Sequence, residues 1–510
     1  MIIPCLHRLK MKKVSQKMKR KRFLSLILAL STVLSITACS GDNVSLSQGD
    51  SGNISKENSS ISSNVSSETS GVATDSEDAV IQNSPNKVDD TLPQCEPANM
   101  LITLANNDDS IMKGKEGYYY STRYESANGW RTLDALHYYD NKMQKSLILC
   151  SKPQCTHDGN EFCTATATDK VSVSFDSAYY YYDDIIYKVF STRPTADNAT
   201  QEFKLYRYDL MGNERSEIAT LATPVVTTED MPHTYITQSI FHYGKMFYVI
   251  HGDVGMKADI YMLDLESGES KRIMTPTTED GAKRISDAFG FITADGDWLY
   301  YPIRYGKYNS NGQQTDANMS YDKTFLYRFN IKTGETETVS AMPDIYSSYA
   351  VNDGIVYYTV VDRKNNTFSL YSYDIAADKT ATLAENIQQS YLDGKYIVSN
   401  NPVTVYTDRQ YLYISTCGDT QHYREDLTDR ERDFYIYSFD GKQLLHGLEG
   451  LPTDREEWSF LFRALNGEIY LKFNAYPKDG EEDSLSGVYM IKTEDLINGG
   501  TEWTKLYKAE

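Results

Sequence analysis

The chain has 510 residues, 41 of them tyrosine, and carries 51 Lys and Arg against 71 Asp and Glu, a formal charge of −20 at pH 7. An acidic surface repels nucleic acid and anionic lipid headgroups, so no nucleic-acid partner is expected. The length exceeds that of one ordinary domain, so the chain holds either several domains or one large repeated architecture.

The N-terminus reads as a secretory signal. A basic run at 18–23 precedes the apolar stretch 24–36, which is shorter than the ~20 residues needed to span a membrane. The following order, Ile36-Thr37-Ala38-Cys39, resembles the bacterial lipoprotein lipobox. That resemblance implies a signal peptide over 1–38 and a lipidated Cys39 as the mature N-terminus.

Two methionines inside this signal, Met11 and Met18, each begin a better signal than Met1 does. The true start is therefore expected at one of them, which would leave Cys5 outside the protein. Removing the nine Lys and Arg residues before Cys39 leaves 42 basic against 71 acidic residues, a formal charge near −29.

Residues 39–90 are predicted to form a disordered tether. Residues 40–70 contain twelve serines in thirty-one positions and almost no large apolar side chain, so they cannot bury enough surface to fold. As a flexible coil the tether reaches on the order of 40 Å, enough to lift a folded domain off a membrane.

A repeat fills the rest of the chain, 91–510. Its first phrase is a tight turn followed by an aromatic strand, found at 115–122, 183–190, 244–252, 295–303, 353–361, 408–416 and 466–473. Its second phrase is a strand followed by a polar turn, found at 136–144, 205–214, 260–269, 326–335, 370–379, 436–443 and 488–496.

Each unit predicts four antiparallel strands, here called a to d from first to last. The Asp-Gly, Gly-Lys and Asn-Gly pairs suit hairpin turns, and alternation of aromatic with polar residues is typical of half-buried strands. Because such a unit cannot bury both faces alone, repetition in a ring predicts an all-β fold, a single β-propeller of seven blades, with six or eight as alternatives.

The phrases "LYRYDLMG" (205–212) and "GIVYY" (354–358), together with the lipobox and the Ser-rich tether, resemble one family, although its YWTD phrase is absent as such. These are the extracytoplasmic lipoproteins of Firmicutes-type bacteria that carry a TolB-like or low-density-lipoprotein-receptor-like propeller. The resemblance implies architecture and a location on the outer face of the cell membrane. Members are mostly of unknown function, so it implies no activity.

A cluster of cysteines stands between the first and second units. Cys150, Cys155, His157 and Cys163 supply three thiolates and an imidazole, a complete ligand set for a structural zinc ion. Alternatively, Cys95 joins the three cysteines to give two disulfides, which persist outside the cell membrane. In a third alternative the cysteines stay free thiols. The cluster is expected on the face that carries the b–c loops and the d–a crossings, or on its rim.

Three functions stay open. The first is a binding module that recognises a glycan, a wall polymer or a protein through long, variable b–c loops. The second is a scaffold or sensor subunit of a membrane assembly. The third is a hydrolase or lyase, for which no catalytic motif is found; it would need carboxylates and histidines meeting in the central channel, where the candidates are His137, His233, His242, His251 and His422.

Overall fold

The computed structural model describes residues 89–95, 111–125, 132–157, 163–166, 171–172, 179–192, 202–223, 235–251, 259–274, 284–285, 292–305, 323–342, 349–362, 364–365, 367–388, 403–415, 434–447, 458–475 and 487–508. All of them belong to the second of two compact units, Asp78–Glu510. The predicted signal peptide, Cys39 and residues 39–88 of the tether lie outside the described residues. Within this described part, no helix is both long and apolar enough to cross a membrane.

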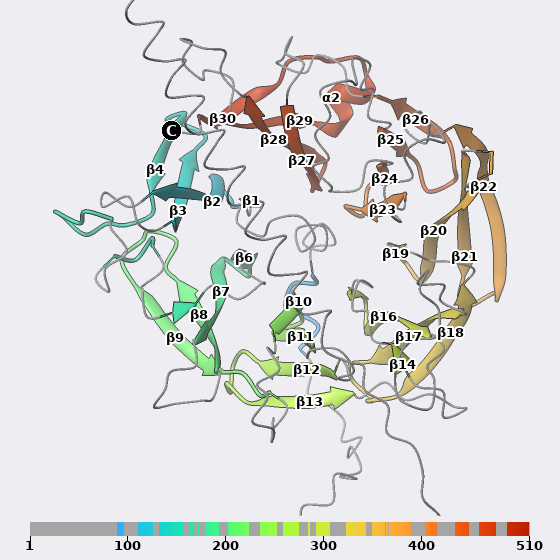
Figure 1. Ribbon diagram of the computed structural model, residues 1–510, viewed down its shortest axis with the longest axis horizontal. Helices are drawn as coiled ribbons and strands as arrows, with labels where there is room; N and C mark the ends of the chain where they lie inside the picture. Colours follow the sequence, from blue (N-terminus) through green and yellow to red (C-terminus); the bar gives the residue numbers. More distant parts are fainter. Residues whose placement is uncertain are drawn as a thin grey trace, which may run out of the picture. The chain divides into compact units, whose positions relative to one another are not determined.

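The predicted seven-bladed β-propeller is confirmed. Seven antiparallel sheets follow one another around a ring, and each is built from one continuous stretch of chain (Figure 1). Blades 1 to 3 contain, in order, β1 (Ile111–Lys113), β2 (Gly117–Glu125), β3 (Thr132–Asp140) and β4 (Lys145–Ile148); β5 (Val171–Ser172), β6 (Tyr179–Tyr182), β7 (Ile185–Thr192), β8 (Phe203–Tyr208) and β9 (Arg215–Thr220); and β10 (Tyr235–His242), β11 (Lys245–His251), β12 (Asp259–Asp264) and β13 (Ser270–Met274).

The other four blades repeat this order, a innermost and d outermost. They contain β14 (Arg284–Ile285), β15 (Thr293–Asp295), β16 (Trp298–Tyr305), β17 (Lys323–Asn330) and β18 (Thr336–Met342); β19 (Tyr349–Asn352), β20 (Ile355–Asp362), β21 (Thr367–Asp374) and β22 (Lys379–Gln388); β23 (Thr404–Thr407), β24 (Leu412–Ser415), β25 (Phe434–Tyr437) and β26 (Gln443–His446); and β27 (Trp458–Leu465), β28 (Glu468–Ala475), β29 (Gly487–Lys492) and β30 (Thr504–Lys508). Strand a is in two pieces in blades 2 and 4. A short helix, α2 (Thr493–Ile497), stands between strands c and d of blade 7.

The core is divided into seven apolar clusters, one at each junction between neighbouring blades. Consecutive residues of an inner strand enter different clusters, since Tyr179 packs toward blade 1 and Tyr180 toward blade 3. The inner strands are therefore buried on both faces, not half-buried as the alternation suggested. This double burial explains the run of four tyrosines in β6, because a wide ring fills each wedge between blades.

Hydrogen bonds between successive a–b turns form a second set of links around the ring. At four junctions a side chain at the end of strand a binds backbone of the next blade's turn. The four bonds are Gly244 N to Tyr182 Oη (2.7 Å), His242 Nε2 to Gly296 O (2.7 Å), Gly354 N to Asp295 Oδ2 (2.9 Å) and Gly467 N to Asp408 Oδ2 (2.8 Å).

Among the described strands, none is exchanged where the ring closes between blades 7 and 1. Glu468 at the start of β28 accepts a hydrogen bond from Tyr118 Oη at 3.2 Å and pairs with Lys113 Nζ at 2.8 Å, both in blade 1. The Tyr470 hydroxyl also donates to Glu468. This buried carboxylate lies against the apolar cluster shared by the first and last blades, so packing and one polar network together hold the ring shut.

We expect Asp408→Ala to lower the melting temperature by several degrees. The side chain is buried, and it accepts hydrogen bonds from Gly467 N, Tyr413 Oη, Gln410 N and Tyr411 N. Leaving these donors without their acceptor costs about 3 kcal/mol. Differential scanning calorimetry measures the shift.

Asp362→Ala is the matched control. Asp362, the last residue of β20, also accepts hydrogen bonds from nearby amides, but it is exposed, and its bonds to Lys364 N and Asn365 N stay within its own blade. Its loss should cost under about 1 kcal/mol. Equal melting temperatures for the two variants would show that the link from blade 6 to blade 7 contributes nothing beyond a local turn.

Candidate metal centre

The cysteine cluster lies on a loop that interrupts strand d of blade 1, between Ile148 and residues 163–166. We call this loop the excursion. β4 pairs with β3 as far as Ile148, and the chain then leaves the ladder. It returns at 163–166, where Leu136 N donates to Ala165 O at 2.9 Å and Thr166 bridges Ala135. The crossing to blade 2 therefore begins after Thr166, not after Cys150 as expected, because residues 164–166 complete the ladder that β4 leaves unfinished.

The excursion seats on the outer turn of blade 2, between β8 and β9. Ser151 N donates to Gly212 O at 3.1 Å, and Thr164 Oγ1 donates to the same oxygen at 2.7 Å. Gly212 has φ +71°, and a Cβ there would stand 2.6 Å from the Leu149 carbonyl carbon, so only glycine fits. The cluster is thus at the outer edge of the junction between blades 1 and 2, against a c–d turn, which emerges on the face opposite the b–c loops and not on the face that the sequence predicted.

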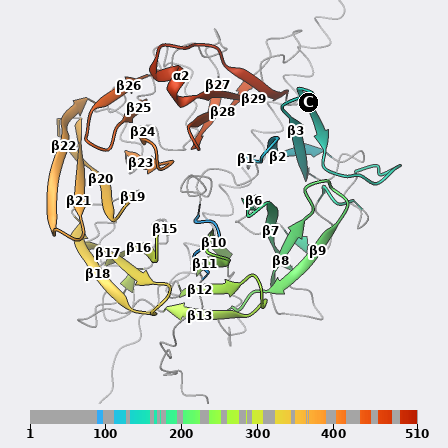
Figure 2. The same ribbon diagram turned by 180° about the vertical axis from the view of Figure 1, so that it is seen from behind.

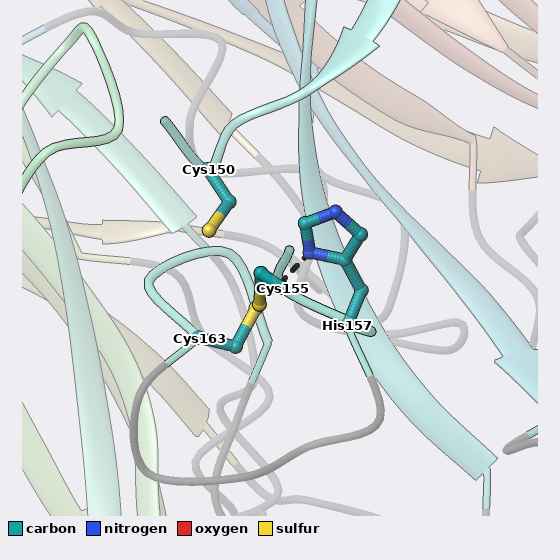
Figure 3. A group of neighbouring side chains, drawn as sticks. All are labelled: Cys150, Cys155, His157 and Cys163. Atoms are coloured by element: carbon teal, nitrogen blue, oxygen red, sulfur yellow. Dashed lines mark hydrogen bonds between the residues drawn. The ribbon is translucent and has the colours of Figure 1, made fainter. Parts of the chain in front are cut away.

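The four predicted ligands converge (Figure 3). The side chains of Cys150, Cys155, His157 and Cys163 point toward one another, and their ligand atoms all lie within 4.8 Å of one another. The dashed contact joins His157 Nδ1 and Cys163 Sγ at 3.4 Å. In a tetrahedral zinc site with Zn–S bonds of 2.3 Å, sulfurs stand about 3.8 Å apart, so the group needs only a small contraction around an ion.

Local backbone geometry brings these ligands together. Gln154 and His157 both have positive φ, at 66° and 52°, on either side of Cys155. Each reverses the direction of the chain, and Cys155 N donates to Lys152 O at 3.3 Å within the first reversal. Left-handed conformations cost free energy in residues other than glycine, so the tight loop is held by its surroundings.

The electrostatics of the cluster favour a cation at its centre. Burial raises the pKa of Cys150, but hydrogen bonds from Thr164 and from nearby backbone amides outweigh it and lower the pKa to about 7. Burial, together with the neighbouring Cys163, raises the pKa of Cys155 to about 11. Three thiolates so close repel one another, and a divalent cation removes that repulsion.

His137 stands beside this centre. Burial and the nearby His157 lower its pKa to about 4, so the imidazole is neutral at physiological pH. Its ring stacks on Tyr120 at 5.2 Å between centroids. His137 therefore lies next to the metal ligands instead of in the channel where it was considered as a catalytic group.

Cys95 lies apart from the cluster. Its Sγ donates to Ala294 O at 3.3 Å, and it packs in the apolar cluster of blades 3 and 4. Cys95, Cys150, Cys155 and Cys163 are all free thiols in the structure. A second disulfide that includes Cys95 therefore has no counterpart in this geometry.

The channel mouth holds one of the considered histidines. His242 is buried with Asp295 and Arg409 nearby, and burial lowers its pKa to about 4. Both of its ring nitrogens bind backbone, Nδ1 accepting from Cys95 N at 2.9 Å and Nε2 donating to Gly296 O. His233 and His422 and the side chain of His251 lie outside the described residues.

Arg409 is a mouth residue that the sequence alone did not single out. Its guanidinium spans from blade 6 to Asp295 of blade 4, with Nη1 to Oδ1 at 2.9 Å. A sequence signal was available, because Arg409 follows Asp in an a–b turn where four other units have glycine, and the structure gives Arg409 a φ of +68°. A strained arginine in a glycine position indicates a specific role for its side chain.

No family model matches the chain, and no curated protein matches it. Solved structures with a similar fold include the β-propeller domain of the Trilobed protease from Pyrococcus furiosus (15% identity, TM-score 0.37, 66% of this chain and 82% of that one). A puromycin-hydrolyzing peptidase from Mycobacterium tuberculosis shares 11% identity (TM-score 0.42, 82% and 56%). An oligogalacturonate lyase from Vibrio parahaemolyticus shares 11% (TM-score 0.37, 67% and 90%). Likenesses this distant carry no conclusion about activity.

Proposed function

We propose that the protein is a lipid-anchored surface protein whose propeller binds a glycan, a wall polymer or a protein partner through the face at which its b–c connections emerge. The observation that carries this proposal is where the long connections attach. Segments 193–202, 306–322, 416–433 and 476–486 each join a strand b to a strand c. Strands a and b are joined at the opposite face by short turns, such as Asp183–Asp184. Loops gathered on one face of a regular scaffold are the usual place of recognition.

Anchoring rests on the order of basic run, apolar stretch and Cys39 in the sequence. We expect Cys39→Ser to abolish incorporation of labelled palmitate and to release the protein into the medium. Cys5→Ser is the control and should change neither, because Cys5 precedes the apolar stretch. A Cys39→Ser protein that is still labelled and still sediments with membranes would contradict the anchor.

Ligand binding is tested by melting the full-length protein in detergent with wall-polymer fragments and glycans. A ligand at a hundred times its Kd adds ~2.7 kcal/mol, which should raise the melting temperature of a domain this large by a degree or two. Replacing 306–322 or 416–433 with a short Gly-Ser linker should remove the shift.

The matched control is Met211→Ser on the opposite face. Met211 is 73% exposed in a turn between strands c and d, so its substitution should leave the ligand shift intact. If Met211→Ser lost the ligand-induced rise in melting temperature and both loop variants kept it, recognition would lie on the face of the a–b and c–d turns, against the proposal. No shift with any ligand, together with no partner cross-linked on intact cells, would overturn the binding proposal.

For the cluster we assign a structural zinc ion. Three cysteines and one histidine form a closed set of four ligands, which leaves no open position for a substrate. A disulfide within the cluster would use two thiols and leave the third thiol and His157 without a role. The ion would join the two ends of the excursion, whose residues Ser151 and Thr164 both bind Gly212 of blade 2.

We expect one zinc ion per purified chain by plasma mass spectrometry, and its loss in Cys155→Ser. Cys95→Ser is the control and should retain the metal, since Cys95 lies apart from the cluster. EDTA should lower the melting temperature of the parent protein by several degrees and leave Cys155→Ser unaffected. The disulfide would be established instead by two results together. The parent protein would contain no metal, and alkylation under denaturing conditions without reductant would label two fewer thiols than the chain has cysteines.

A further inference from the structure

A short segment before the first blade, Asp89–Cys95, lies across the mouth of the channel on the side of the a–b turns. In Figure 2 it is the blue segment next to β10, near the middle of the ring. We call it the strap. None of its residues belongs to a blade, yet its hydrogen bonds reach turns of blades 2, 3, 4 and 6.

The backbone of the strap is bound at two points. Pro93 O accepts from Tyr182 Oη at 2.8 Å and from Tyr243 N at 3.0 Å. Cys95 N donates to His242 Nδ1 at 2.9 Å. Because the same Tyr182 hydroxyl accepts from Gly244 N, the strap is attached to the link that joins blades 2 and 3.

Three side chains of the strap fit particular places. Cys95 is 4% exposed and packs in the apolar cluster of blades 3 and 4. Leu92 lies over Gly244, where a Cβ would come within 2.6 Å of its Cδ1. Asp90 Oδ2 accepts from Lys332 Nζ at 3.0 Å. The site therefore offers a cation to Asp90, a space beside a glycine to Leu92 and apolar packing to Cys95. These features follow the order of the three residues along the strap.

Arg409 covers the end of the strap. Its Nη2 donates to Cys95 O at 3.5 Å and to Ala294 O at 3.3 Å, while Nη1 pairs with Asp295. The guanidinium thus ties the strap to blades 4 and 6 at once. This contact accounts for an arginine in a left-handed conformation where glycine would be less strained.

Most of the contacts that hold the strap are polar, and none of its residues belongs to a strand of a blade. Thr91, Pro93 and Gln94 are exposed, whereas Leu92 is half-buried and Cys95 is buried. A free peptide of this size would bind weakly, but attachment to the chain supplies an effective concentration of about a millimolar. Such a segment stays bound most of the time and can be displaced by a competing peptide.

We propose that the a–b mouth is a peptide-docking site and that Asp89–Cys95 is its resident ligand, a detachable strap that closes the mouth. The site takes a peptide that begins with a turn, as residues 89–92 do, and that carries an acidic residue, a leucine and a small apolar residue at positions matching Asp90, Leu92 and Cys95. Release exposes Tyr182, His242 and Arg409 to a competing peptide of the same pattern.

Alkylation of Cys95 in the full-length chain reports release, because the thiol is buried while the strap is bound. Peptide mapping by mass spectrometry separates Cys95 from the other thiols. We expect Arg409→Gly and Tyr182→Phe each to speed alkylation of Cys95 by about tenfold, since each removes a hydrogen bond to the strap. Arg272→Ala, which breaks an ion pair with Asp259 within blade 3, should leave the rate unchanged.

A synthetic peptide with the sequence of residues 89–95 and serine in place of the cysteine, added above the strap's effective concentration of about a millimolar, should also speed alkylation, whereas a scrambled peptide should not. The melting temperature of each variant is measured as well. Faster alkylation of Cys95 at an unchanged melting temperature, in Arg409→Gly or in Tyr182→Phe, reports release of the strap and not a folding defect. Equal Cys95 rates in the parent, both variants and the peptide-treated chain would overturn the proposal. So would a Cys95 rate that equals the rate of global unfolding.

Discussion

The structure depends on the hydrogen bond by which a side chain at the end of one inner strand holds the next blade's a–b turn. Apolar clusters fill all seven junctions, but packing alone is non-directional and sets no rotation between blades. A bond between Gly467 N and Asp408, or between Gly354 N and Asp295, fixes both distance and direction at the narrow end of its own junction. Among the described strands the last and first blades share none, so such directional bonds, present at four of the seven junctions, add what packing lacks.

The candidate metal centre and the strap each reinforce the links between neighbouring turns. At the junction of blades 1 and 2 the turns are joined by an ion pair between Lys115 and Asp184, whose side chains are 76% and 44% exposed. Exposed pairs contribute little to stability. The excursion with the four metal ligands packs at the outer rim of that same junction, against Gly212. The strap in turn binds where Tyr182 and His242 link blades 2, 3 and 4.

The sequence was sufficient to predict the architecture and the members of the cluster. Repeated turns such as Gly244-Lys245 are local signals, and the four candidate metal ligands lie within fourteen positions of one another. The return of Thr166 to the ladder beside Ala135 was not predictable, since a bridge between distant residues leaves no local pattern. The strap was missed for the same reason: Cys95 meets residues 242, 294 and 409, and only the fold brings them together. Anchoring at Cys39 stays a prediction.

The central claim is that links between a–b turns hold the ring, and hydrogen exchange at single amides tests it most directly. The amides of Gly244, Gly354 and Gly467 donate to side chains of the preceding blade. If these bonds open only when blades separate, the three amides exchange as slowly as those of the inner strands, such as Tyr413 in β24. Exchange at the rate of exposed turns, with the neighbouring strands still protected, would contradict the claim and leave apolar packing as the force that holds the ring.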